Sequence, residues 1–78
     1  MELRAAQSEV ETISRVYARL HGIERTDDWL VLKLTEEVGE LTQAYLAASG
    51  RSRREPDPGA VAAELADVLA HLLLLAER

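Results

Sequence analysis

Two pairs of acidic residues stand at helical spacing in separate parts of the sequence. Glu37 and Glu40 are three residues apart, and Glu64 and Asp67 are also three apart. Residues at this spacing are neighbours on a helix surface, so each pair brings two carboxylates together. A carboxylate pair separated by about 4 Å repels by roughly 4 kcal/mol at an effective dielectric constant near 20. These pairs are therefore expected to need a cation.

The sequence offers these acids few basic side chains. No Lys or Arg lies between Lys33 and Arg51, and none lies between Arg54 and Arg78. Mg²⁺, with Mn²⁺ as a possible substitute, prefers oxygen ligands, and facing helices of bundles hold metals through inward-pointing acids. The alternative is that each pair is a solvated helix face, which is the usual outcome for a single E-x-x-E. We predict a magnesium site with the ligands Glu37, Glu40, Glu64 and Asp67.

Three other side chains lie close in sequence to these acids. Lys33, one turn before Glu37, forms either an ordinary ion pair or a contact with a metal-bound phosphate. Glu36 is expected to point further toward solvent. His71, one turn beyond Asp67, is a packed side chain, a hydrogen-bond partner of that carboxylate or a metal ligand.

A basic cluster and a single tryptophan complete the candidate set. Arg51, Arg53 and Arg54 lie between the two acid pairs, where they form a solubilising loop or capture phosphate. Trp29 either anchors the start of the second helix to the core or stacks on a base.

Three helices are expected to position these residues, over roughly 2–21, 28–48 and 58–77, because apolar residues recur at three- and four-residue steps. Gly22 and Ser49-Gly50 end the first two helices, Thr26, Asp27 or Asp28 caps the second, and Pro58 is expected as the first residue of the third. No strand pattern occurs, so the fold class is all-α. The expected core stripes are Leu3, Ala6, Val10, Ile13, Tyr17 and Leu20 in the first helix and Leu30, Leu34, Val38, Leu41, Tyr45 and Ala48 in the second.

The third helix is apolar or Ala on almost every side, which is typical of a helix buried on all sides. A chain of 78 residues, 47% apolar and without cysteine, forms one domain, 1–78, with a marginal core that needs a metal or a partner subunit. We therefore expect a homodimer or homotetramer with a four-helix-type bundle core.

Composition excludes several classes of function. A net charge of −5 argues against binding to a nucleic-acid polymer, which rests on clustered cations. Neither a membrane-spanning segment nor a signal peptide is apparent, so we expect a cytoplasmic protein without a membrane partner. Without cysteine or a Ser–His–Asp arrangement, covalent catalysis has little support.

Two stretches carry a family resemblance. Residues 29–45 read W-L-V-L-K-L-T-E-E-V-G-E-L-T-Q-A-Y, and residues 64–75 read E-L-A-D-V-L-A-H-L-L-L-L. They resemble the MazG-like all-α nucleoside triphosphate pyrophosphohydrolases, whose pattern is K…E-E-x-x-E on one helix and E-x-x-D on the next. The matching region spans about two-thirds of the chain.

The resemblance implies an enzyme that hydrolyses a nucleoside triphosphate to a monophosphate and pyrophosphate, in a nucleotide-pool house-cleaning role. It implies that the four acids hold Mg²⁺ and that Lys33 approaches the phosphates. Glu36 is implied in orienting or activating water through a second metal. The expected catalytic residues are Glu36, Glu37 and Lys33, and the expected substrate-binding residues are Lys33, Arg51, Arg54 and Trp29.

Two alternatives stay open. The string A-D-x-x-x-H-L-L also resembles the phosphoribosyl-ATP pyrophosphohydrolases of histidine biosynthesis, and a non-catalytic helical oligomerisation module with structural acids would fit the same pattern. Members of the MazG-like family commonly continue into a further helix, whereas this sequence ends at Arg78. Either the sequence is a piece of a longer one, or a neighbouring subunit completes the pocket.

Overall fold

The computed structural model describes residues 2–78 as three helices: α1 (Leu3–His21), α2 (Asp27–Ala48) and α3 (Ala60–Glu77). Within these residues there is no strand, so the all-α prediction is confirmed. The described chain measures 37 × 29 × 20 Å. None of its helices is long and apolar enough to cross a membrane.

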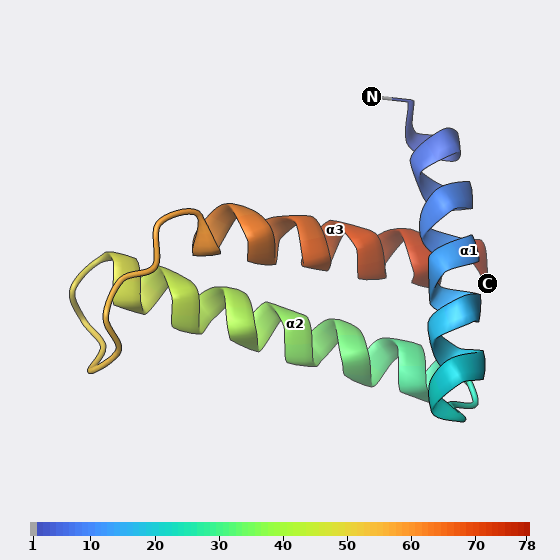
Figure 1. Cartoon of the computed structure of the whole chain (residues 1–78), viewed down its shortest axis with the longest axis horizontal. Coiled ribbons are helices and arrows are strands. Elements are labelled where there is room, and N and C mark those ends of the chain that lie inside the picture. Colours follow the sequence, from blue (N-terminus) through green and yellow to red (C-terminus); the bar gives the residue numbers. More distant parts are fainter. Residues whose placement is uncertain (1) are drawn as a thin grey trace.

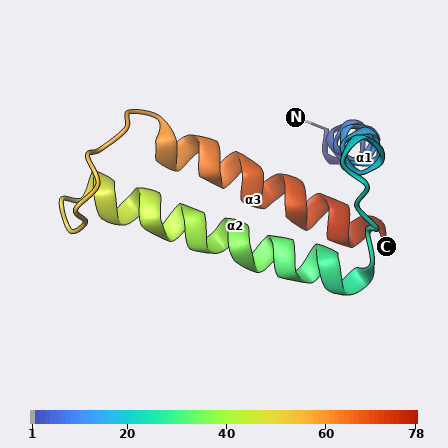
Figure 2. The same cartoon turned by 60° about the horizontal axis from the view of Figure 1, so that its bottom comes forward.

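Helices α2 and α3 form an antiparallel hairpin, and α1 crosses the C-terminal end of α3 (Figures 1 and 2). Helix α3 packs against both of the others, whereas α1 and α2 make no direct helix-to-helix packing. A salt bridge of 2.9 Å between Arg78 Nε and Asp27 Oδ1 ties the end of the chain to the start of α2. The acid-bearing helices α2 and α3 are therefore direct neighbours.

Three of the helix ends lie where the sequence predicts them. Gly22 ends α1 in the left-handed conformation, with φ 65°, and the Ile23 amide donates to the Ala18 carbonyl at 2.9 Å. Thr26 is the cap of α2, because its hydroxyl accepts a hydrogen bond from the Trp29 amide at 3.0 Å. Gly50 follows α2 with φ 74°, so the predicted Ser49-Gly50 stop is confirmed.

Helix α3 begins later than the sequence predicts. Pro58 is not its first residue, because the Ala60 amide donates to the Asp57 carbonyl at 3.0 Å and closes a turn there. Gly59 has φ 86° and ψ −6°, the left-handed geometry that a type II turn requires at its third position. Proline presets the second position of such a turn as readily as it starts a helix. The prediction for Pro58 is therefore wrong.

The core stripe of α2 is shifted from the predicted one. Leu30, Glu37, Ala44 and Ala47 are its buried residues, whereas Val38 and Tyr45 from the predicted stripe are 43% and 53% exposed. A single neighbour, α3, covers α2, and it covers the side that carries Glu37. Leu30 of the predicted stripe is buried as expected, whereas Val38 and Tyr45 flank the contact with α3, and Glu37 lies in that contact.

The predicted stripe of α1 is largely uncovered. Ile13, Tyr17 and Leu20 are 67%, 54% and 76% exposed, whereas Ala18 is buried. Because α1 crosses α3 at its end instead of lying along it, α1 buries only a short contact. Helix α3 also keeps Leu65, Leu69 and Leu72 partly exposed, so its expected burial on all sides does not occur within one chain.

Candidate metal centre

Five carboxylates gather where the middles of α2 and α3 meet. One carboxylate oxygen each of Glu37, Glu64 and Asp67 lies within 4.8 Å of the other two, and Glu36, Glu37 and Glu40 form a second group at the same spacing. Glu37 belongs to both groups. The structure thus brings together, across two helices, the acids that the sequence selected as ligands, with Glu36 at the edge.

Burial leaves two of these oxygens unsatisfied. Glu37 is only 9% exposed, and the Oε2 atoms of Glu37 and Glu64 are buried without a hydrogen-bond partner. Within residues 2–78, no Lys or Arg forms a salt bridge with any of the four predicted ligands. An uncompensated buried carboxylate is strongly unfavourable in a folded chain.

The environment shifts the pKa values of both glutamates upward. Burial raises the pKa of Glu37, and the neighbouring Glu40 raises it further, against a smaller opposing effect of His71. Burial and then Glu40 likewise raise the pKa of Glu64, while Arg54 lowers it. Desolvation and like charge both disfavour the ionised form. Without a cation, the cluster therefore tends to retain protons.

These acids fit a hard divalent cation. Carboxylate oxygens are the donors that Mg²⁺ and Mn²⁺ prefer, and the two orphaned oxygens of Glu37 and Glu64 lack any other partner. A cation between the helices would satisfy both oxygens and remove the repulsion. Two groups of carboxylates, which share Glu37, are close enough to hold a cation: Glu37 with Glu64 and Asp67, and Glu37 with Glu36 and Glu40.

Lys33 pairs with Glu36 instead of Glu37. Its Nζ lies 2.9 Å from Glu36 Oε1, and the two side chains are 30% and 55% exposed. This hydrogen bond raises the pKa of Lys33. As expected, Glu36 points toward solvent, and the Lys33 ammonium lies beside the carboxylate cluster while remaining accessible to a ligand.

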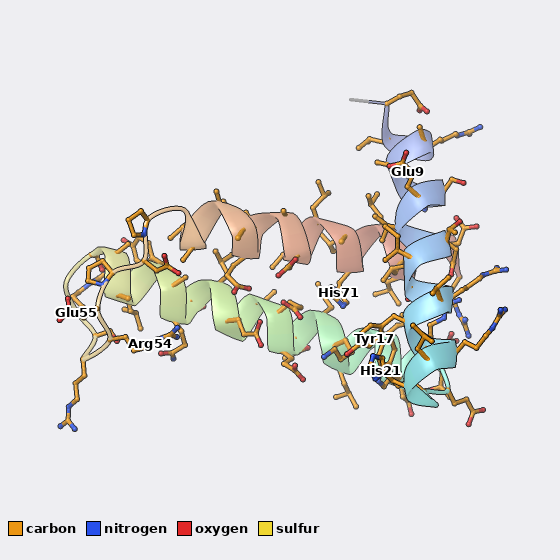
Figure 3. The ribbon with its side chains drawn as sticks, in the orientation of Figure 1. Glu9, Tyr17, His21, Arg54, Glu55 and His71 are labelled. Carbon is orange, nitrogen blue, oxygen red and sulfur yellow. The ribbon has the colours of Figure 1, made fainter. Side chains whose placement is uncertain are left out.

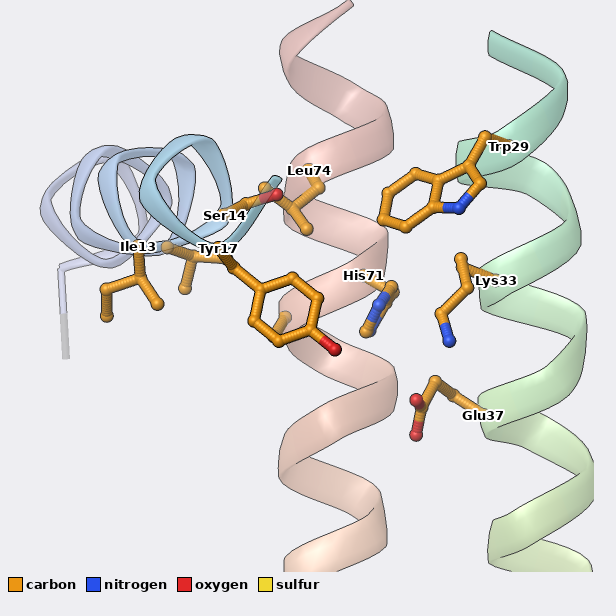
Figure 4. A pocket seen from close by; sticks show the side chains of 10 residues that line it. Ile13, Ser14, Tyr17, Trp29, Lys33, Glu37, His71 and Leu74 are labelled. Atoms are coloured by element: carbon orange, nitrogen blue, oxygen red, sulfur yellow. The ribbon is translucent and has the colours of Figure 1, made fainter. Parts of the chain in front are cut away.

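His71 contacts the backbone of Asp67. Its Nδ1 lies 2.9 Å from the Asp67 carbonyl oxygen, and because a carbonyl only accepts, the ring donates from that nitrogen. The carboxylate of Asp67, which the sequence suggested as a partner, does not receive this bond. The imidazole instead lies between Tyr17 and Lys33 (Figure 4).

A cavity of about 350 Å³ opens beside the cluster. Residues from all three helices line it, including Trp29, Lys33 and Glu37 from α2, His71 from α3 and Tyr17 from α1 (Figure 4). Most of the other lining residues are apolar. The cavity therefore joins an apolar, aromatic compartment to a cation and a carboxylate.

Sequence reasoning missed the contribution of α1 to this cavity. Ile13 and Tyr17 were expected in the core, and they line the open pocket instead. Their helical spacing is the same for either role, so periodicity gave no signal that separates the two.

Arg51 and Arg54, on the loop between α2 and α3, have different surroundings. The Arg51 guanidinium carbon lies 5.1 Å from the centre of the Tyr45 ring, and Arg51 Nε donates to the Ser49 hydroxyl at 3.0 Å. Arg54, on the loop between α2 and α3 (Figure 3), lies near enough to lower the pKa of Glu64. Of the two predicted substrate-binding arginines, Arg54 is thus the one placed near the cluster.

Comparison with known proteins found no matching family model, no matching curated protein and no matching solved structure.

Proposed function

We propose that the chain is a Mg²⁺-dependent nucleoside triphosphate pyrophosphohydrolase of the MazG-like type, which converts a (d)NTP to a (d)NMP and pyrophosphate. The observation that supports this most is the pair of buried carboxylate oxygens of Glu37 and Glu64 without partners. The proposed magnesium ligands are Glu37, Glu40, Glu64 and Asp67.

When bound, Mg²⁺ supplies charge neutralisation on the phosphates and a lower pKa for a coordinated water. The chain's own part begins with Lys33, which exchanges its partner Glu36 for a substrate phosphate. This exchange frees the Glu36 carboxylate to accept a proton from the attacking water. The anhydride bond between the α- and β-phosphates breaks, and pyrophosphate leaves. No nucleophilic side chain is needed.

The cavity suits the base of the substrate. Trp29 and Tyr17 offer aromatic faces in its walls, and stacking on such faces contributes about 1–3 kcal/mol per base. Arg54, close to Glu64, is proposed to contact the outer phosphates. Arg51 remains a second proposed phosphate contact, and reaching the substrate requires it to leave the Tyr45 ring.

The test is pyrophosphate release from a panel of canonical and modified dNTPs together with phosphoribosyl-ATP, with Mg²⁺ and with EDTA. Magnesium-dependent turnover of dNTPs supports the proposal. Turnover of phosphoribosyl-ATP alone would assign the chain to histidine biosynthesis instead. No turnover, with no change of melting temperature in Mg²⁺, would favour the non-catalytic oligomerisation module.

The proposal includes self-association into a homodimer or homotetramer, because α3 leaves Leu65, Leu69 and Leu72 partly exposed. A house-cleaning role toward the nucleotide pool and a cytoplasmic location belong to the same proposal. A nucleic-acid polymer is not a proposed partner, since the site carries more acid than base.

A further inference from the structure

The residues that line the cavity lie on successive levels along the α2–α3 hairpin. On α2, Trp29, Lys33 and Glu37 follow one another at steps of four residues, and each step advances about 6 Å along the helix axis. Figure 4 shows Trp29 and Leu74 at one end of the cavity. It shows Lys33 and His71 in the middle and Glu37 at the other end. The lining therefore changes along the hairpin from apolar and aromatic, through a lysine and a histidine, to carboxylate.

A nucleoside triphosphate is built in the same order as these levels. Its base suits the aromatic level at Trp29, and its phosphates suit the level of Glu37, where the proposed magnesium ligands lie. The sugar joins the base to the α-phosphate, so a substrate held at both ends has its sugar at the middle level. This placement rests on the proposed function. The cavity volume of about 350 Å³ lies within the roughly 300–1,000 Å³ of small-molecule sites.

His71 brings an unused hydrogen-bond acceptor to the middle level. Its Nδ1 donates to the Asp67 carbonyl oxygen at 2.9 Å, and within residues 2–78 the ring makes no other hydrogen bond. In a neutral imidazole with its proton on Nδ1, the nitrogen Nε2 has a free lone pair and accepts hydrogen bonds. The side chain is half-buried, and the Nδ1 bond restricts the orientation of the ring. Nε2 is therefore available to a ligand in the cavity.

An acceptor at this level selects among the groups of a nucleotide. Magnesium-bound phosphate oxygens only accept hydrogen bonds, so Nε2 of His71 has no favourable contact with them. The hydroxyl groups of the sugar donate. Lys33, on the opposite helix at the same level, has the reverse character, because its ammonium group has donors and no acceptor. The chemistry of the two side chains therefore assigns phosphate to Lys33 and a sugar hydroxyl to His71.

The other lining residues near this level leave that contact to His71. Ala70, the neighbouring residue of α3 in the lining, has no polar side-chain atom. The hydroxyl of Ser14, on α1, already accepts a hydrogen bond from Arg25 at 3.1 Å. Tyr17 reaches from α1 toward the imidazole of His71 (Figure 4). A sugar at the middle level is thus enclosed between α1 and the hairpin, where less water competes for Nε2.

We propose that His71 determines specificity for the sugar of the substrate, because its Nε2 accepts a hydrogen bond from a sugar hydroxyl. The 3′ hydroxyl occurs in both ribonucleotides and 2′-deoxynucleotides, and the 2′ hydroxyl occurs in ribonucleotides alone. A nucleotide that lacks the contacted hydroxyl is disfavoured, since it leaves the buried Nε2 without a partner. His71 takes no part in breaking the anhydride bond.

The second of the chain's two histidines provides a matched control. His21, on α1, is exposed and stacks on Tyr17 with ring centres 4.3 Å apart (Figure 3). It does not line the cavity. His71→Phe and His21→Phe each keep a planar ring and remove its nitrogens. A difference between the two variants therefore reports on the position of His71 and not on the loss of a histidine.

The first test compares kcat/KM for the ribo, 2′-deoxy and 2′,3′-dideoxy triphosphates of the base that is turned over fastest, from pyrophosphate release with Mg²⁺. We expect wild type and His21→Phe to prefer the triphosphate that carries the contacted hydroxyl by about tenfold, the upper range for one neutral hydrogen bond. A preference for 2′-deoxy over dideoxy identifies the 3′ hydroxyl, and a preference for ribo over 2′-deoxy identifies the 2′ hydroxyl. His71→Phe should lose the preference.

The preference separates recognition of the sugar from a purely structural role of His71, because a distorted cavity slows all three substrates alike. Wild type with neither preference, or a His71→Phe variant that keeps the wild-type preference, would overturn the role of His71 and leave the hydrolase proposal standing. Absence of turnover with every triphosphate would contradict the proposed function instead.

A second measurement needs no turnover. Trp29 is the chain's only tryptophan and lines the cavity, so its fluorescence reports a nucleotide bound there. In titrations with the ribo, 2′-deoxy and 2′,3′-dideoxy monophosphates, the Kd values of wild type should differ by about the same factor as kcat/KM. If His71→Phe fails to fold, His71→Leu, which also lacks an acceptor, replaces it and should bind all three alike. Equal Kd values in wild type, or no fluorescence change with any monophosphate, would overturn the proposal.

Discussion

Glu37 and Glu64 approach each other from α2 and α3, and each leaves one carboxylate oxygen buried without a hydrogen-bond partner. The two helices that stabilise one another by apolar packing are thus also opposed by like charges at the middle of their contact. A cation bound there would satisfy both oxygens. Stability and metal binding are therefore expected to be linked, and each of the four acids should affect both.

Replacement of Glu37 by Gln should raise the stability of the metal-free protein and abolish its stabilisation by Mg²⁺. The amide removes a buried charge from a side chain that is only 9% exposed, so the metal-free protein should gain about 1 kcal/mol, or roughly 5 °C in melting temperature. Wild type should gain about 1.4 kcal/mol when Mg²⁺ is present at tenfold its Kd, and the variant should gain nothing. Thermal denaturation with Mg²⁺ and with EDTA measures both effects.

Glu9→Gln is the control for this substitution, because Glu9 is exposed on α1 (Figure 3) and distant from the cluster. It should leave the melting temperature within about 2 °C of wild type and preserve the Mg²⁺ response. A Glu37→Gln variant that still gains stability in Mg²⁺ like wild type would remove Glu37 from the site.

The pH dependence of stability follows from the raised pKa values of Glu37 and Glu64. In the folded, metal-free protein these groups hold protons at a pH where the unfolded chain has lost them. Folding then takes up protons, so the free energy of unfolding falls as pH rises. This decline spans the interval from the ordinary glutamate pKa, about 4.3, up to the raised values.

Wild type in EDTA should therefore become more stable, relative to Glu37→Gln, as pH is lowered from 7 toward 5. Saturating Mg²⁺ should reverse the sign, because the cation binds the ionised carboxylates and competes with protons. Denaturant titrations of both proteins at several pH values measure the difference. Parallel curves for wild type and Glu37→Gln in EDTA would mean that Glu37 titrates as it does in the unfolded chain.

The three helices, the ends of α1 and α2 and the start of α2 were predictable because their signals are local. Gly22 and Gly50 adopt positive φ angles, and Thr26 bonds the amide three residues on, without help from distant parts of the chain. The prediction that Pro58 begins α3 failed because a turn and a helix start both require the φ angle that proline adopts. Local chemistry alone did not distinguish the two.

The meeting of Glu37 with Glu64 was also foreseen, since missing counter-ions and facing helices both pointed to it. The position of α1 was not foreseen. Its apolar stripe fits a core helix, yet Ile13 and Tyr17 line an open cavity because α1 crosses only the end of α3. Crossing geometry depends on loop length and on contacts such as the salt bridge between Glu11 and Arg25, which periodicity does not encode.

Lys33→Met should affect catalysis far more than stability. The ion pair with Glu36 is substantially exposed, with side-chain exposures of 30% and 55%, and such pairs contribute about 0–1 kcal/mol. Loss of a cation directed at the phosphates should lower kcat/KM about 100-fold. Pyrophosphate release and thermal denaturation measure the two quantities.

Arg15→Gln is the control, since the exposed Arg15 pairs with Glu11 on α1, and Glu11 keeps Arg25 as a second partner when Arg15 is replaced. It should change neither quantity by more than about 0.5 kcal/mol. If Lys33→Met retains the kcat/KM of wild type, Lys33 serves only as the ion-pair partner of Glu36, and its proposed role toward phosphate is wrong.

Arg54→Gln tests whether the loop contributes to substrate binding. Arg54 lies close enough to Glu64 to lower the pKa of that carboxyl, so its cation acts at the edge of the cluster, where the outer phosphates are proposed to lie. Its loss should raise KM about tenfold, equivalent to about 1.4 kcal/mol of binding, with little change in kcat.

The neighbouring Arg53→Gln removes the same charge from the same loop and should raise KM less than twofold, because long-range attraction alone is screened by salt. Steady-state kinetics of both variants at about 150 mM ionic strength, which is physiological, distinguish a specific contact of Arg54 from the general charge of the loop. Equal KM values for the two variants would favour the solubilising role.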